Sequence, residues 1–165
     1  MVFSSIYIYA HKSDETELKS FYDVNNQVSP DIKFIERVDH THAFEGRVGF
    51  EKDSYNYWRT HLCMDFVSAM SAAMEKVPAE ETNYFMWLED DTVFTHNTPT
   101  ILKEYITKNS EFKWMRCGVG ATCLLFDRDT LTSVLEIVRS KWYNDIPIDL
   151  MYHLFPKSTC PSLPY

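Results

Sequence analysis

The sequence has little glycine, no excess of basic residues and no long apolar run. Four glycines in 165 residues leave little flexible linker, and no internal repeat or low-complexity segment is present. The formal net charge is −8, and binding to a phosphate backbone depends on clustered lysines and arginines. We therefore expect no nucleic-acid partner. No window approaches a membrane span, and residues 1–10 lack the basic leader and continuous apolar core of a signal peptide.

A cysteine framework is also missing. No Cys-x-x-Cys pair occurs and the cysteines lie in apolar stretches, which argues against a zinc site or structural disulfides and favours buried thiols. We therefore expect a soluble protein with a cytoplasmic location for the chain as written. A Golgi or ER lumen location is expected only if the chain is a fragment of a longer polypeptide. The cysteines are Cys63, Cys117, Cys123 and Cys160.

The residues that are abundant indicate a globular protein. The chain is 45% hydrophobic and 15% aromatic, and its length predicts one domain over residues 1–165. Phe3–Ala10 and Ile32–Val38 alternate as strands, with an N-capped helix beginning near Ser13 between them. Residues 39–57 show no period and suggest either a mobile loop that covers a substrate or a plain long connection.

The clearest helix is predicted over residues 60–77, with Leu62, Phe66, Met70, Ala73 and Val77 forming one apolar stripe. Asp65 lies beside this stripe, so its carboxylate is expected to hydrogen-bond a neighbour at the helix start or in a nearby loop. His40 and His42 lack a third metal ligand nearby, which favours a solvent-facing pair.

A second half follows Pro78. Strands are predicted at 84–88, 113–117 and 121–126, and helices at 100–108, from Asp129 onward and at 150–155; Ile101, Leu102, Tyr105 and Ile106 should face inward on the first of these helices. Between two of the strands, Gly118 and Gly120 either permit close approach to a ligand or form a tight turn. The element order predicts an α/β fold, a sandwich with a mainly parallel mixed sheet.

Three consecutive carboxylates, Glu89, Asp90 and Asp91, follow the apolar strand Tyr84–Leu88. Adjacent anions repel one another, so a folded chain keeps them at a strand end only with a cation, a substrate or water to compensate. Carboxylate oxygens suit Mg²⁺ or Mn²⁺, and open α/β sheets bind ligands at such edges. A solvated acidic turn is the alternative interpretation.

Three segments, by their order and spacing along the chain, resemble the GT-A glycosyltransferases. They are most similar to the branch that contains N-acetylglucosaminyltransferase IV and the enzyme that adds N-acetylgalactosamine to GPI anchors. The segments are Tyr57–Phe66, Tyr84–Phe94 and Trp114–Asp149, which together make up about one third of the chain. The resemblance implies a Rossmann-like GT-A domain, a three-layer sandwich, and transfer of a sugar from a nucleotide sugar, by analogy UDP-linked, to a glycan or glycoprotein acceptor.

The resemblance also implies roles for individual residues. Glu89-Asp90-Asp91 stands at the family's "DXD" element: Asp91, with Asp90, would bind Mn²⁺ or Mg²⁺, and Glu89 and Asp90 would face the ribose and the metal's waters. Chemistry supports this independently, because a divalent ion stabilises the charge that develops on a departing nucleoside diphosphate. The set assigned to the nucleotide is completed by three further residues, His11, Asp39 and Arg59.

Asp149 matches the aspartate that this branch places at a helix start on the acceptor side, the implied general base of an inverting transfer. An ordinary helix cap is its alternative role. His153 is either an additional metal ligand or a helix-surface histidine. We expect a chain this short for the family to lack an anchor, stem or second domain, so the N-glycan or GPI acceptor and the Golgi setting do not follow from the resemblance.

Two rival interpretations come from other classes. A haloacid-dehalogenase-type phosphatase places acids after an apolar strand, but Glu89 stands where its nucleophilic aspartate belongs, and the motif lies far from the N-terminus. A non-catalytic GT-A-like module that holds a nucleotide or glycan without turnover is the remaining alternative. Asp149 separates it from the enzyme, because a binding module needs no base there.

Overall fold

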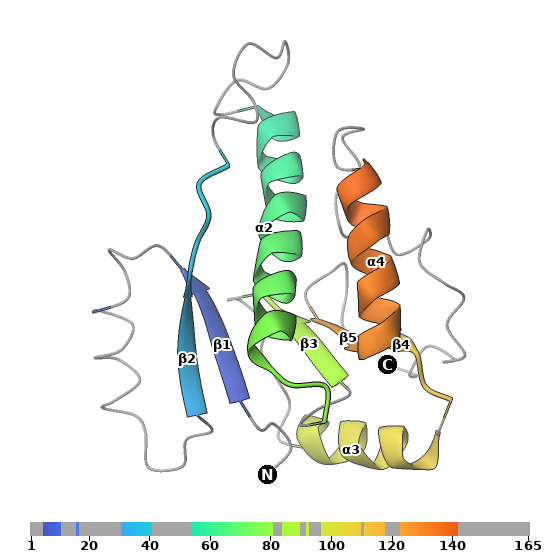
Figure 1. Ribbon diagram of the computed structural model, residues 1–165. Coiled ribbons are helices and arrows are strands. Elements are labelled where there is room, and N and C mark those ends of the chain that lie inside the picture. The colour runs from blue at the N-terminus through green and yellow to red at the C-terminus, as the bar shows by residue number, and fades with distance from the viewer. Residues whose placement is uncertain are drawn as a thin grey trace. The chain divides into compact units, whose positions relative to one another are not determined.

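A computed structural model of the chain describes residues 5–10, 16, 31–40, 54–80, 84–89, 92, 97–109, 111–117 and 123–141 (Figure 1). The chain divides into two compact units, residues 1–39 and 40–165. Helices and strands occur together, which confirms the α/β class. The single domain over residues 1–165 stays a prediction.

The first unit contains two parallel strands, β1 (Ser5–Ala10) and β2 (Asp31–Glu36), paired in register from Ser5 opposite Asp31 to Ala10 opposite Glu36. The pairing continues past β2, where the Arg37 N–H donates to the Ala10 carbonyl at 2.8 Å. The Tyr9 hydroxyl accepts a hydrogen bond from the Val38 N–H at 2.9 Å. Both predicted strands are confirmed, and the helix predicted between them lies outside the described residues apart from Thr16, which is helical.

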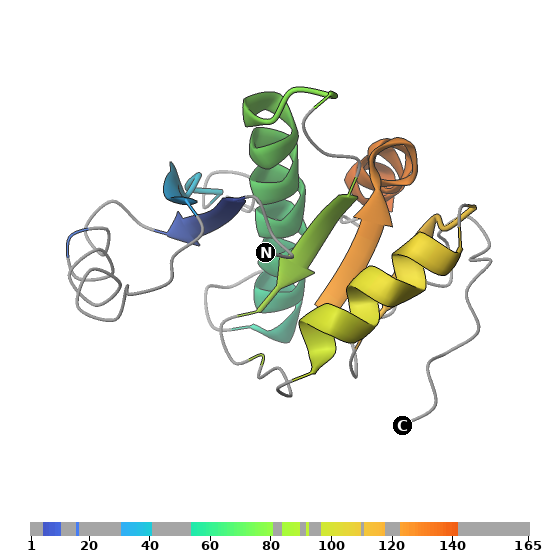
Figure 2. The same cartoon turned by 90° about the horizontal axis from the view of Figure 1, so that it is seen from below.

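The second unit contains a three-stranded sheet of order β3-β5-β4, formed by β3 (Tyr84–Leu88), β4 (Trp114–Arg116) and β5 (Cys123–Asp127). Both pairings are antiparallel, and Figure 2 shows the arrows of β3 and β5 pointing in opposite directions. The mainly parallel sheet predicted from the element order is therefore wrong for these strands. The connection from β4 to β5 is short, and a short connection joins antiparallel strands because parallel ones need a crossover of a dozen or more residues.

The helices of the second unit are α2 (Tyr55–Lys76), α3 (Thr98–Lys108) and α4 (Arg128–Lys141). Helix α2 begins five residues before the predicted start because Ser54 caps it, its hydroxyl accepting from the Tyr57 N–H at 3.1 Å. Asp127 caps α4 through the Thr130 N–H at 2.7 Å. The cap predicted at Asp129 is thus two residues too late, since the strand itself ends on the capping carboxylate.

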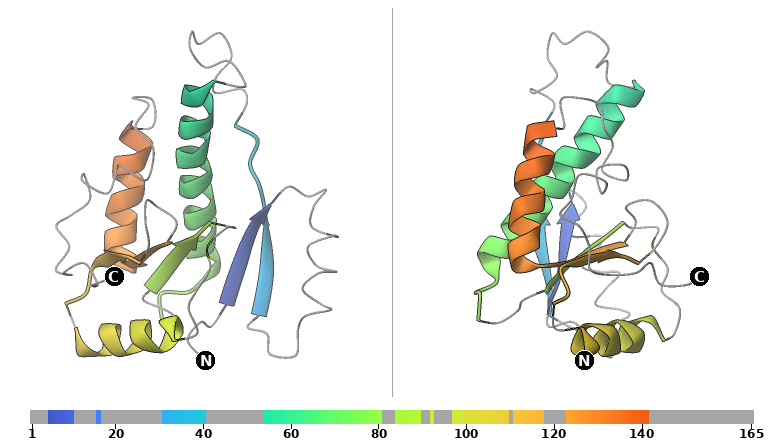
Figure 3. Two further views of the ribbon diagram at one scale, coloured as in Figure 1. Left: turned by 180° about the vertical axis from the view of Figure 1, so that it is seen from behind. Right: turned by 90° about the vertical axis from the view of Figure 1, so that its right-hand side faces the viewer.

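Helices cover both faces of this sheet, and Figure 3 shows α3 on one side with α2 and α4 on the other. Alternate residues of β5 point to opposite faces. Phe126 contacts Phe66 of α2, with ring centroids 6.3 Å apart, whereas Leu125 joins Leu102 of α3 in a buried cluster. The second unit therefore has three layers around a small antiparallel sheet.

Most of the predicted core positions are buried. Phe66, Met70 and Ala73 lie on the apolar face of α2, and Val77, the residue that follows the helix, is also buried. The inner face of α4 is formed by Leu131, Val134, Leu135 and Val138. The inward orientation predicted for Ile101 is wrong, since its side chain is 49% exposed while Leu102 is buried. Leu102, Tyr105 and Ile106 form one i, i+3, i+4 face, and Ile101 lies at its margin.

The direction of α2 relative to β3 is set at two points. Asp127 pairs with Tyr84, the first residue of β3, and Arg128 follows Asp127 in the chain. The Arg128 guanidinium donates to the Val77 carbonyl at 2.7 Å, which fixes the C-terminus of α2 near the start of β3. Near the other end of β3, Trp87 contacts Phe66 edge-to-face, with centroids 5.3 Å apart. The eleven residues of α2 before Phe66, about 16 Å of helix at 1.5 Å per residue, therefore extend beyond the C-terminal end of β3 (Figure 1).

None of the helices within the described part of the chain is long and apolar enough to cross a membrane.

Candidate functional site

The acidic segment begins where the sequence predicted, directly after the last residue of β3. Glu89 is half-buried at this strand end. The Thr92 N–H donates to the Glu89 carbonyl at 3.0 Å, so the two residues that flank Asp90 and Asp91 are brought together. Asp90 and Asp91 themselves lie outside the described residues.

The sheet edge at the end of β3 is built from strands of both directions. Leu88 pairs with Cys123, the first residue of β5, and the Cys117 N–H donates to the Cys123 carbonyl at 2.9 Å. The C-terminal ends of β3 and β4 and the N-terminal end of β5 therefore share this edge. The binding-edge rule for parallel strands does not apply to it, and the site must be argued from its side chains.

The N-terminal half of α2 carries polar side chains on the part of the helix that extends beyond this end of the sheet. Arg59, His61 and Asp65 all precede Phe66, the residue that contacts β3, and so lie on the part of α2 that extends beyond the strand end. The Arg59 guanidinium carbon is 4.6 Å from the centre of the Tyr55 ring, a cation–π contact that holds it at the helix start. Tyr55 in turn stacks on Trp58.

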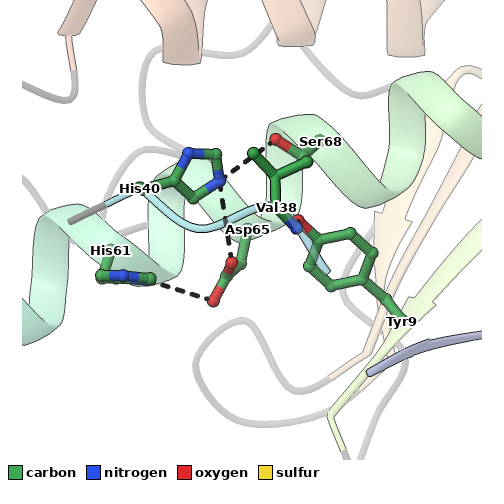
Figure 4. Close-up of polar contacts among 6 residues, drawn as sticks. All are labelled: Tyr9, Val38, His40, His61, Asp65 and Ser68. Atoms are coloured by element: carbon green, nitrogen blue, oxygen red, sulfur yellow. Dashed lines mark hydrogen bonds and ion pairs between the residues drawn. The ribbon is translucent and has the colours of Figure 1, made fainter. Parts of the chain in front are cut away.

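Asp65 is the centre of a polar cluster of described residues (Figure 4). Its carboxylate is 3.4 Å from His61 Nδ1, one helical turn earlier, and 3.8 Å from His40 Nε2. His40 Nε2 is also 3.3 Å from the Ser68 hydroxyl, and the two imidazole rings meet edge-on with centroids 5.6 Å apart. The prediction that Asp65 bonds a neighbour at the helix start or in a nearby loop is confirmed.

The solvent-facing position predicted for His40 is wrong, because its side chain is only 11% exposed. A carboxylate on the inner side of a helix needs partners, and His40 supplies one from the segment that precedes α2. His42 lies outside the described residues. Sequence reasoning missed this cluster as a unit; the only local signal for it was the i, i+4 spacing of His61 and Asp65.

The geometry of the cluster limits its chemistry. Ser68 and Asp65 both approach the same nitrogen of His40, whereas a serine nucleophile needs the carboxylate on the nitrogen opposite the hydroxyl. The two imidazoles approach different oxygens of Asp65. Within the described ranges, no three or more His, Cys, Asp or Glu side chains are arranged to hold a metal ion. The contacts of His40 with Asp65 and Ser68 join α2 to the segment that precedes it.

The remaining predicted site residues divide into two groups. Asp39 is exposed and ends the first unit, whereas Arg59 and Glu89 belong to the second. Arg59, on the part of α2 before Phe66, and Glu89, directly after β3, lie toward the same end of the second unit. The others lie outside the described residues: His11, Asp90, Asp91, Asp149 and His153.

Comparisons with known proteins give no family assignment: no protein-family model, curated protein or solved structure matches the chain.

The donor set of the acidic segment fits a hard divalent ion. Glu89, Asp90 and Asp91 offer only carboxylate oxygens, and the segment begins at a half-buried position where uncompensated charge is costly. Mg²⁺ and Mn²⁺ prefer such ligands and retain waters and phosphate oxygens in their remaining positions. Thiolate and imidazole metals are not favoured by this set.

Proposed function

We propose that the chain is a metal-dependent glycosyltransferase that moves a sugar from a nucleotide sugar, UDP-linked by analogy, to a hydroxyl acceptor on a glycan or glycoprotein. The observation that carries the proposal is the placement of the acidic segment. It follows the partly buried strand β3 at the end of the sheet, its flanking residues Glu89 and Thr92 are hydrogen-bonded to each other, and α2 extends beyond that end of the sheet. The second unit is a layered mixed α/β arrangement around a small antiparallel sheet, and a GT-A type of fold is part of the proposal.

In this proposal Asp91 and Asp90 hold Mn²⁺ or Mg²⁺, and the ion stabilises charge on the departing diphosphate. Glu89 orients the ribose end of the nucleotide from the strand terminus. Arg59 adds positive charge on the overhanging helix, where Tyr55 already holds its guanidinium. These roles explain how a chain of net charge −8 binds an anionic donor without a basic patch.

Asp149 is the proposed base, taking the proton of the incoming acceptor hydroxyl during a single displacement that inverts the anomeric centre. A nucleotide- or glycan-binding module that lacks turnover is the alternative function. The two differ in outcome: a module binds nucleotide in a metal-dependent way but releases no nucleoside diphosphate with any acceptor.

Isothermal titration of UDP in the presence of Mn²⁺ tests the metal assignment. Asp91→Asn removes one anionic ligand and should weaken Mn²⁺-dependent UDP affinity by about 10-fold or more, since one lost charge-assisted contact of about 1.5–3 kcal/mol corresponds to that factor. Asp129→Asn is the matched control, because Asp129 is exposed at the start of α4. Equal affinities in wild type, Asp91→Asn and Asp129→Asn would refute the assignment.

A thermal-shift panel of nucleoside diphosphates and nucleotide sugars, each with and without Mn²⁺, identifies the donor. A ligand that binds only the folded chain raises the melting temperature by mass action. The proposal requires a shift that depends on both a specific nucleotide and the metal. No shift with any nucleotide at millimolar concentration would sink it.

A further inference from the structure

Two thiols lie opposite each other at the ends of β4 and β5. Arg116 pairs with Leu124, and the same antiparallel register continued by one residue sets Cys117 opposite Cys123. The Cys117 N–H donates to the Cys123 carbonyl at 2.9 Å, which confirms that the pairing reaches these residues. Directly opposed residues of a hydrogen-bonded antiparallel pair have Cα atoms about 5.5 Å apart, within the range of roughly 4.4–6.8 Å that a disulfide spans.

The side chains of this pair also interact. The side chain of Cys117 hydrogen-bonds to that of Cys123 and lowers its pKa; burial acts in the opposite direction, and a hydrogen bond from the Cys117 backbone lowers the pKa further, so that the net shift is downward. Both residues are thiols and not disulfide-bonded. A thiolate is the form that attacks a disulfide, so the lowered pKa of Cys123 suits this residue to the second exchange, in which it attacks a mixed disulfide on Cys117.

The two thiols differ in access. Cys117 is half-buried, whereas Cys123 is only 2% exposed. A reagent in solution therefore reacts with Cys117 first, and Cys123 is the buried second thiol. This division matches the two roles that a dithiol needs, an attacking thiol and a resolving one.

We propose that Cys117 and Cys123 form a redox-sensitive dithiol that low-molecular-weight disulfides, such as oxidised glutathione, convert to an intramolecular disulfide. This inference does not depend on the proposed glycosyltransferase activity. It also assigns chemistry to two cysteines for which the sequence predicted only burial.

The reaction proceeds by two exchanges. Cys117 loses its proton, and its thiolate attacks one sulfur of oxidised glutathione; the S–S bond breaks and one glutathione thiolate leaves. The Cys123 thiolate then attacks the Cys117 sulfur, the protein disulfide forms and the second glutathione thiolate leaves. The two protons of the cysteines pass to the two glutathione thiolates, so two protein thiols are oxidised as one glutathione disulfide is reduced.

The bond would close the chain around residues 118–122 and join β4 to β5 at the edge that carries Glu89. Cys123 pairs with Leu88, the residue directly before Glu89. The oxidised form therefore fixes one side of the acidic edge covalently.

Exposure of the folded chain to oxidised glutathione, followed by an acid quench, alkylation and tryptic mass spectrometry, tests the proposal. Cleavage after Arg116 and Arg128 leaves both cysteines on the peptide of residues 117–128. In the wild type this peptide should lose two hydrogen atoms and escape alkylation. Cys123→Ser should stop at the mixed disulfide of glutathione with Cys117, and Cys117→Ser should lose the reaction.

Cys63→Ser and Cys160→Ser are the matched controls, and both should form the 117–128 disulfide as the wild type does. A wild-type chain that stops at the glutathione adduct, or that links Cys117 to Cys160, would overturn the proposal. If the serine variants at positions 117 and 123 do not fold, the rate of disulfide formation in the folded wild type is compared with the rate in the wild type unfolded by urea. The disulfide must then form faster in the folded chain than in the unfolded one, and equal rates would also overturn the proposal.

Discussion

Replacing Phe66 by alanine should loosen the contact that sets the position of α2 on the sheet. Phe66 is fully buried and contacts Trp87 and Phe126, so its ring ties the helix to two neighbouring strands. Truncating a buried phenylalanine to alanine costs about 3–5 kcal/mol, because the ring loses its apolar contacts and the cavity does not close. At about 2–4 °C per kcal/mol for a chain of this size, 4 kcal/mol lowers the melting temperature by about 8–16 °C.

Thermal unfolding followed by circular dichroism measures this shift. Ile101→Ala is the control, since Ile101 is about half exposed on α3 and its truncation should change the free energy of unfolding by less than about 0.5 kcal/mol. Phe66→Leu keeps most of the volume and should cost less than the alanine variant. A melting temperature for Phe66→Ala within error of Ile101→Ala would refute the packing argument, and with it the position of the overhanging helix half.

Two further substitutions test the cluster on α2 and the proposed base. Asp65→Asn removes the anionic acceptor shared by His40 and His61. It should lower the free energy of unfolding, measured in urea, by about 1–3 kcal/mol. A loss equal to that of the control Asp129→Asn would show that the cluster does not contribute to stability. Asp149→Asn should keep nucleotide and metal affinity while slowing transfer by about 10²-fold or more; a product that NMR shows to retain the donor's anomeric configuration would rule out the single displacement.

The sequence predicted those elements whose period is carried by their own residues. The alternating residues of β1 and β2 and the apolar faces of α2 and α4 appear in the structure as expected, because burial of one face dictates such spacing. The start of α2 was missed because Ser54 lies in a stretch without any period, and a cap is a single-residue signal.

Features that depend on distant partners were not predictable in this way. The direction of β5 is fixed by its pairing with β3, and its own continuous apolar run is the pattern more typical of a parallel strand that is covered on both faces. His40 seemed exposed from its local sequence because its partners, Asp65 and Ser68, lie more than twenty residues later. Glu89 at the strand end was predictable because the apolar run before it ends abruptly.

The position of β5 between β3 and β4 has a consequence for synthesis of the chain. β5 is the last of the three strands to leave the ribosome, yet it supplies the pairing for both of the others. A short connection joins β4 to β5, so these two strands can pair locally. β3 pairs with β5 only after α3, β4 and β5 have been synthesised. Pairing across such a separation closes a larger loop and forms later. A nascent chain that stops before Cys123 therefore carries the acidic segment on a strand without its β5 partner, and the candidate site is assembled only after nearly the whole described part of the chain has been made.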